Sequence, residues 1–391
     1  MEIPERYKGH EQAFVKHTLL KAYLERLFMI LGQFHRVIRY VDCFSGPWHE
    51  EGSDLKYTSI RISLDLMRQC RETLKNKGRE VRFHALFIEK DKRAFRKLQE
   101  YLATIPPEEV LVEALHGDFY ELRESILDWC GPDDFTFFFI DPKGWKRVVE
   151  ISTLAPLLRR PNSEFLINFM YDFLIRAHSQ ETFHAHMEAI FGDAPDTGGM
   201  SPAEKEEYLV DLYKMRLKEI LPIGGLSKPR AVTVPVLFPL KNRTKYHLVY
   251  LTRSAKGITV FMNESENLEI VQRRVRALAK KDKRFSRTRQ HELFSADKMD
   301  SPFPQKDSNE VMDYWLKHLM TTPRFFGIEE LAMMLEETGW FESDLQAAFG
   351  ALQLEGKVKN LDVPPKGRRT KRFIHFESNS NRGERLIKVE K

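Results

Sequence analysis

The stretch VIRYVDCFSGPW, residues 37–48, runs from a short apolar segment through an aspartate into a Gly-Pro turn. This β-branched and aromatic run is too short for a helix and predicts a buried strand. A glycine directly after such a strand lets the backbone approach a ligand, so residues 42–46 form a candidate binding turn. Polar residues also end ordinary strands, and for Asp42 taken singly this alternative stays open.

Helices and strands are predicted in alternation on both sides of this stretch. Apolar residues recur at helical spacing over 11–31 and 59–76. Further strands are predicted at 83–91, 110–119, 135–140, 164–170, 230–240 and 245–254. The alternation predicts an α/β fold with a Rossmann-like, seven-stranded, mostly parallel sheet that ends in an antiparallel hairpin, and with an α-helical insertion at about 178–221.

The 391 residues are enough for more than one domain. We expect the first domain to cover 1–265, and a basic helix with a linker to cover 266–306. Three short helices and a strand pair around a basic turn over 307–391 predict a C-terminal winged-helix (α+β) domain.

The charge balance implies nucleic-acid binding only where the charge is clustered, because 62 basic residues face 57 acidic ones and the net charge is +5. Two basic clusters occur, in the predicted basic helix and in the turn of the winged helix. The candidate nucleic-acid contacts are Arg273, Arg274, Lys280, Lys281, Arg284, Arg368, Arg369, Lys371 and Arg372. We expect nucleic acid, DNA in particular, as the partner; docking of a protein and a solvated helix face are the alternatives.

Metal and disulfide chemistry have little support in the sequence. The three cysteines are far apart and form no Cys-x-x-Cys pair, and the histidines within 178–186 lack the spacing of a shared helix face, so no metal site is predicted. No apolar segment reaches the ~18 residues of a membrane span, and the N-terminus is charged, so a soluble cytoplasmic protein is expected.

Four of the predicted strands end in or just before an acidic residue. These residues are Asp42, Glu89, Asp118 and Asp141. In open α/β sheets ligands bind beyond the carboxyl ends of the strands, and an acidic residue ending the second strand can accept hydrogen bonds from both hydroxyls of a ribose. Asp141 is followed by Pro142-Lys143-Gly144-Trp145, which places a carboxylate, a rigid turn, a cation and an aromatic ring at the same edge.

The segments YVDCFSGPW, FIEKD, HGDF and FFFIDPKGW, in this order and spacing, resemble the motifs of the three-Cys-motif partner family, whose members have a class I S-adenosylmethionine-dependent methyltransferase fold. KHTLLKAYL, LINFMYDFLIR and YHLVYLTRSAKGITVFM, the last interpreted as part of the hairpin, are similar to the same family, so that the resemblance covers about 14–262. It implies a pocket for S-adenosylmethionine. The contacts expected in that pocket are Asp42, Phe44, Ser45, Gly46, Glu89, Asp118 and Phe119. Asp141 would lie at the catalytic edge, and Pro142 and Trp145 complete the candidate catalytic set.

The resemblance implies a methyltransferase that acts on or with nucleic acid, together with a partner protein that carries three cysteines and is radical-S-adenosylmethionine-like. The alternative is a non-catalytic Rossmann-like subunit or adaptor for that partner. Trp48 stands where the family usually has glycine, so its side chain either fills cofactor space or stacks beside the cofactor. Asp141-Pro142 also differs from the Asp-Pro-Pro-Tyr motif of amino-methylating enzymes.

Overall fold

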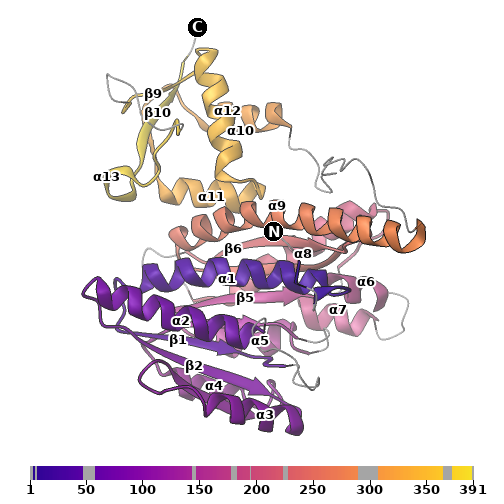
Figure 1. Cartoon of the computed structure of the whole chain (residues 1–391). Coiled ribbons are helices and arrows are strands. Elements are labelled where there is room, and N and C mark those ends of the chain that lie inside the picture. The colour runs from indigo at the N-terminus through magenta and orange to yellow at the C-terminus, as the bar shows by residue number, and fades with distance from the viewer. Residues whose placement is uncertain are drawn as a thin grey trace. The chain divides into compact units, whose positions relative to one another are not determined.

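The computed structural model describes residues 3–4, 7–46, 58–142, 147–177, 183–193, 195–222, 228–288, 307–363 and 372–389. The chain forms two compact units (Figure 1). Unit 1 comprises Met1–Arg253 with Leu278–Gln290, and unit 2 comprises Ser254–Ala277 with His291–Lys391. One of the divisions, between Ala277 and Leu278, falls within one long helix, α9 (Ala255–Thr288), as does the expected boundary at residue 265.

Unit 1 is built on a seven-stranded sheet in the order β3-β2-β1-β4-β5-β7-β6. Its strands are β1 Val37–Asp42, β2 Arg82–Glu89, β3 Leu111–His116, β4 Phe135–Ile140, β5 Ser163–Phe169, β6 Arg230–Leu237 and β7 Thr244–Thr252. Neighbours pair in parallel except β7, which is antiparallel to both β5 and β6. The predicted seven-stranded, mostly parallel sheet with an antiparallel hairpin is confirmed.

One helix precedes the first strand of this sheet, and the others connect the strands that follow. They are α1 Glu11–Leu31, α2 Ser59–Asn76, α3 Lys92–Leu102, α4 Arg123–Cys130, α5 Ile151–Leu158, α6 Tyr171–Ala177, α7 Phe183–Phe191 and α8 Pro202–Ile220. Local sequence sets where several begin: Asp91 caps α3 by accepting from two backbone N–H groups, and Ser201 with Glu204 forms a capping box on α8. The helices α7 and α8 lie in the predicted insertion.

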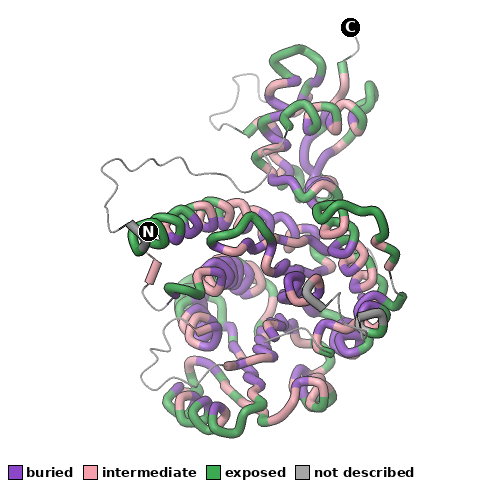
Figure 2. Tube along the Cα trace, turned by 90° about the vertical axis from the view of Figure 1, so that its right-hand side faces the viewer, coloured by how far each residue is buried: buried purple, intermediate pink, exposed green. Residues whose placement is uncertain are grey.

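The centre of the sheet supplies the core of unit 1. Every residue of β4 and β5 is buried, as the unbroken apolar run in β4 predicts for a strand covered on both faces. The rings of Phe138 and Phe165 stack across these strands with centroids 5.0 Å apart. The edge strand β3 has no fully buried residue. In Figure 2 the interior of the trace is mostly buried, and exposed residues lie on the outside.

A buried carboxylate ties three elements of unit 1 together. Glu164 on β5 accepts hydrogen bonds from Tyr23 of α1 at 2.9 Å, from Tyr250 of β7 at 2.8 Å and from Thr252 of β7 at 2.7 Å. Burial raises the pKa of Glu164, and the three hydroxyl donors oppose that rise. The carboxylate is therefore satisfied only when α1 and β7 are both in place.

The structure corrects the interpretation of one segment, AKGITVFM, residues 255–262. The interpretation places it within the hairpin, but β7 ends at Thr252 and the segment forms the start of α9. Ala255, Ile258, Phe261 and Met262 are buried, and their spacing is that of one helix face. The helical period therefore decides this segment, despite its β-branched residues.

Unit 2 also contains a small antiparallel sheet in the order β8-β10-β9. Its elements after α9 are α10 Ser308–His318, β8 Arg324–Phe326, α11 Ile328–Thr338, α12 Glu342–Leu354, β9 Val358–Asn360, the short α13 Ser378–Asn381 and β10 Glu384–Lys388. The fully buried Trp315 anchors α10 on α12, donating from its indole nitrogen to the carbonyl of Leu345 at 2.9 Å. Among the helices that the structure describes, none is long and apolar enough to cross a membrane.

Candidate functional site

The four acidic strand ends meet at one edge of the sheet in unit 1. Because β3, β2, β1 and β4 are adjacent and parallel, their carboxyl ends form a continuous edge. Asp42 ends β1 and Glu89 ends β2, while Asp141 directly follows β4 and Asp118 lies two residues after the end of β3. The loops are joined there by backbone hydrogen bonds, among them Ser45 N–H to the carbonyl of Ile88 at 2.8 Å.

Asp42 lies beneath this edge and is fully buried. One carboxylate oxygen accepts from the Ser59 hydroxyl of α2 at 2.6 Å, and the other accepts from the backbone N–H of Phe44 at 3.1 Å. Burial raises the pKa of Asp42 to about 6, although both hydrogen bonds oppose the rise; the charge of Asp141 adds to it. Asp42 thus fixes the turn after β1 to the start of α2.

Asp42→Asn is expected to change how stability depends on pH. The folded pKa of Asp42 lies above the unfolded value of about 3.9, so its contribution is complete below that value and is lost as the pH rises through about 6. Between pH 4 and 7 the free energy of unfolding of the wild type should therefore fall by about 2–3 kcal/mol relative to that of the variant. Urea unfolding at both pH values measures this. Asp133→Asn, at an exposed position, is the matched control. If wild type and Asp42→Asn differ in free energy of unfolding by the same amount at pH 4 and pH 7, the expectation is contradicted.

The ends of β2 and β3 carry the residues expected around a nucleoside. Glu89 accepts from the backbone N–H of Asp91 at 2.7 Å through one oxygen; its other oxygen has no hydrogen bond within the described part of the chain. Asp118 pairs with Lys90 at 2.7 Å, which lowers the pKa of Asp118. The rings of Phe44 and Phe119 meet with centroids 5.3 Å apart, so the structure brings these two predicted residues together.

Asp141 is held from two sides. Its Oδ2 pairs with the Lys16 ammonium of α1, and its Oδ1 accepts from the Asn168 amide of β5 at 2.7 Å. Burial alone would raise the pKa of Asp141, but the Lys16 charge and the two hydrogen bonds outweigh it and lower that pKa. Asp141 is therefore kept ionised. The Oδ1 atom of Asn168 is buried and has no hydrogen-bond partner among the described residues.

Three residues of this edge are not predicted from the sequence: Lys16, Ser59 and Asn168. The sequence pattern places Lys16 among the polar positions of its helix, yet it is only 9% exposed. Gln12, Lys16, Leu20 and Tyr23 are all buried and follow one another at spacings of four, four and three, so they form a row on one helix face. A lysine within such a row is the signal that could have identified it.

Some predicted residues lie outside the residues that the structure describes. They are Trp48, Trp145, Arg368, Arg369 and Lys371. Pro142 is described and is buried directly after Asp141.

The described basic residues of α9 differ in exposure. Arg273 pairs with Glu269 at 3.1 Å and is partly buried, whereas Arg274, Lys280, Lys281 and Arg284 are exposed. Arg372 in unit 2 is exposed, and its guanidinium lies 3.9 Å from the carboxylate of Glu342. Exposed ion pairs at such a distance contribute little stability.

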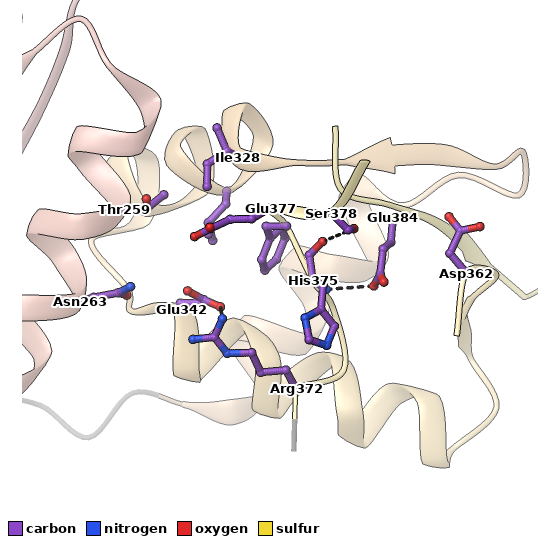
Figure 3. Close-up of a pocket in the computed structure, with 12 residues that line it drawn as sticks. Thr259, Asn263, Ile328, Glu342, Asp362, Arg372, His375, Glu377, Ser378 and Glu384 are labelled. Carbon is purple, nitrogen blue, oxygen red and sulfur yellow. Dashed lines mark hydrogen bonds and ion pairs between the residues drawn. The ribbon is translucent and has the colours of Figure 1, made fainter. Parts of the chain in front are cut away.

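Unit 2 contains a pocket of about 420 Å³, between α9, α11, α12 and the segment before β10 (Figure 3). Several of its carboxylates already have partners. Glu384 accepts from the backbone N–H of His375 at 2.9 Å, and Glu377 pairs with Lys256 at 2.5 Å. In the part of the chain that the structure covers, no group of three His, Cys, Asp or Glu side chains is placed to hold a metal ion.

The strand order with an antiparallel β7 is typical of the methyltransferase fold, and the acidic edge lies where such sheets bind ligands. No protein-family model and no curated protein matches the chain.

Three solved structures are similar to this chain at low identity. Protein LPL1258 from Legionella pneumophila, of the family model DUF519, is 12% identical over 61% of this chain and 85% of its own, with a TM-score of 0.34. MNMC2 from Aquifex aeolicus is 11% identical over 58% of this chain and 56% of its own, with a TM-score of 0.28. Loganic acid methyltransferase with SAH is 10% identical over 69% of this chain and 88% of its own, with a TM-score of 0.28. The fold class rests on the strand order.

Proposed function

We propose that unit 1 binds S-adenosylmethionine and that the protein is a methyltransferase. The observation that carries the proposal is a pair of acceptors at the carboxyl edge, one oxygen of Glu89 and Oδ1 of Asn168, that have no hydrogen-bond donor among the described residues. The ribose hydroxyls and the ammonium group of this cofactor are donors, so the acceptor set fits it. When bound, the cofactor supplies a methyl group on a positively charged sulfur.

The residues of the chain take separate parts in this proposal. Glu89 accepts from the ribose, Phe44 and Phe119 give apolar surface, and the turn at Ser45 and Gly46 lets the backbone approach the methionine end. Asp141, ionised by Lys16, has a second lone pair on each oxygen and orients an N–H or O–H of the methyl acceptor.

The ion pair between Lys90 and Asp118 favours the alternative of a non-catalytic adaptor, because Lys90 occupies an acceptor that the adenine would use. The Lys90 side chain is 75% exposed, and ion pairs of exposed groups contribute little stability. Displacing it therefore costs little, and we retain the enzyme as the first proposal. In the adaptor alternative the chain serves a partner protein with three cysteines.

Nucleic-acid contact through unit 2 is the second part of the proposal. The helices α11 and α12 are joined by the short turn 339–341, whose Gly339 is left-handed, as in a helix-turn-helix. This turn and the three antiparallel strands support a winged helix. The second helix, α12, contains no Lys or Arg. We therefore assign phosphate contacts to the basic residues of 366–372, most of which lie outside the described residues, and to α9, with duplex DNA as the favoured partner.

Titration calorimetry with S-adenosylmethionine tests the first part. Glu89→Gln removes the charge of the ribose acceptor and is expected to weaken binding about tenfold or more, since hydrogen bonds to charged groups are worth about 1.5–3 kcal/mol. Glu100→Gln, on the exposed side of α3, is the matched control. Absence of heat with the wild-type protein at high concentration would exclude the cofactor proposal, and equal affinity of Glu89→Gln would exclude its ribose contact.

A further inference from the structure

Unit 1 has a hollow at the amino ends of β1 and β2, away from the carboxyl ends where the proposed cofactor site lies. Its volume is about 700 Å³, and it is lined by residues 32–36 after α1 and by residues 78–80 and 82 between α2 and β2. The strand β1 starts next to Arg36 and ends at Asp42, so at ~3.3 Å per residue the hollow lies roughly 20 Å from the acidic edge.

Phe34 stands on the rim of this hollow and is 81% exposed. The turn that carries it is fixed, because the N–H groups of residues 32–35 donate to carbonyls of the last turn of α1 at 2.8–3.1 Å. The turn also packs closely on α2: a Cβ on Gly32 would lie 2.3 Å from Cδ1 of Leu74. Phe34 is therefore held in solvent, where it offers a ring face for stacking.

Three arginines line the same hollow: Arg36, Arg79 and Arg82. All three are exposed, and none has a side-chain hydrogen bond or ion pair with any residue that the structure describes. Backbone bonds fix their positions, since Arg82 N–H donates to the Arg36 carbonyl at 2.8 Å and Arg79 N–H donates to the Leu74 carbonyl at 2.9 Å.

Other functions for these arginines find little support. Carbonyls at the ends of α1 and α2 already accept from the N–H groups of the turns, so the arginines are not needed as caps. The lining contains one acidic residue, Glu80, and burial lowers the pKa of His35, which is therefore uncharged at neutral pH. The hollow thus combines a positive field with a fixed aromatic face.

We propose that this hollow binds single-stranded nucleic acid, with one base stacked on Phe34 and the adjacent phosphates contacting Arg36, Arg79 and Arg82. Unpaired bases expose the face that the ring requires, whereas a duplex covers it by its own stacking. A polyanion without bases would use the arginines alone. The site is independent of the cofactor and of the basic residues of 366–372.

Fluorescence anisotropy with labelled twelve-nucleotide oligo-dT and oligo-U tests this on the full chain, without S-adenosylmethionine. Phe34→Ala is expected to weaken binding roughly tenfold. Arg36→Gln and Arg79→Gln should each weaken it and reduce the slope of log affinity against log salt by about 0.7. Leu354→Ala, an 88% exposed apolar residue in unit 2, and the exposed Arg96→Gln of α3 are matched controls.

A local measurement separates this site from the basic surfaces assigned above. Photo-crosslinking with an oligonucleotide that carries 4-thiouracil, read by mass spectrometry, should label the peptide containing Phe34. Crosslinks confined to α9 or to residues 366–372, or unchanged affinity of Phe34→Ala, would overturn the proposal. Heparin bound as tightly as oligo-U, with no effect of Phe34→Ala, would instead identify a general polyanion surface. Thermal unfolding confirms that each variant folds.

Discussion

Lys16→Met is expected to lower the free energy of unfolding of unit 1 by about 3 kcal/mol at pH 7. The substitution leaves the carboxylate of Asp141 largely buried without its cation, and breaking a buried ion pair from one side costs about 3–5 kcal/mol. The lower end of this range applies because the side chain of Asp141 is 19% exposed and retains its hydrogen bond from Asn168. Urea denaturation measures the change.

A double variant distinguishes lost charge pairing from lost packing. Lys16→Met with Asp141→Asn removes both charges and is expected to recover most of the loss, since an apolar or neutral pair is often as stable as the ion pair. Lys21→Met, at an exposed position of the same helix, is the control and should change little. If the double variant is as unstable as Lys16→Met alone, the loss does not come from the uncompensated carboxylate.

The effect of Lys16→Met should also depend on pH. The folded pKa of Asp141 is lowered, so the stability it contributes is present above the unfolded value of about 3.9 and is lost as the pH falls through the folded pKa. Without Lys16, burial raises the pKa of Asp141 instead. The deficit of the variant should therefore shrink as the pH falls from 7 toward 3, and a deficit that does not change with pH would contradict the assignment.

Gly383→Ala is expected to destabilise unit 2 by about 4 kcal/mol. Gly383 has φ of 75°, and a Cβ at this position would lie 1.7 Å from the backbone carbonyl oxygen of Phe326. The left-handed conformation costs a non-glycine residue about 1–2 kcal/mol, and forced overpacking typically adds about 1–3 kcal/mol. Because the obstructing atom belongs to the paired strand β8, relief requires that β8 and β10 separate.

Gly356→Ala is a matched control for this strain. Gly356 has φ of 71°, but a Cβ at this position would meet nothing within 4 Å, so only the conformational cost of about 1–2 kcal/mol remains. Hydrogen exchange read by mass spectrometry should show loss of protection in β8 and β10 for Gly383→Ala and retained protection for Gly356→Ala. Equal protection in both variants would contradict the clash.

The sheet of unit 1 could be predicted from the sequence because each strand is a short apolar run that ends in a polar turn. The period of the pattern separates strands from helices, and it also indicates a helix at 255–262, where the interpretation as part of the hairpin is wrong. The strands β8 and β10 are not predicted. The three residues of β8, Arg324–Phe326, are too few to show any period. This strand is defined instead by its pairing with β10, a partner about sixty residues away. The strand expected after the basic turn is wrong, because the described residues 372–377 form no strand and the partner of β9 is β10, Glu384–Lys388.

The candidate site could be predicted in part for the same reason. Residues at strand ends can be placed from local pattern, because parallel strands bring their carboxyl ends to one edge. Lys16 and Asn168 reach Asp141 from 125 and 27 residues away, so their contacts depend on how α1 and β5 pack. No local spacing encodes such a contact.

The hydroxyl cluster around Glu164 has a consequence for the order of folding during synthesis. Its donors come from α1, near the start of the chain, and from β7, which ends at Thr252. A nascent chain that has emerged only through β5 would have to bury Glu164 without Tyr250 and Thr252, at the cost of an unsatisfied carboxylate. The cluster is therefore complete only after the ribosome has released β7, the last strand of unit 1.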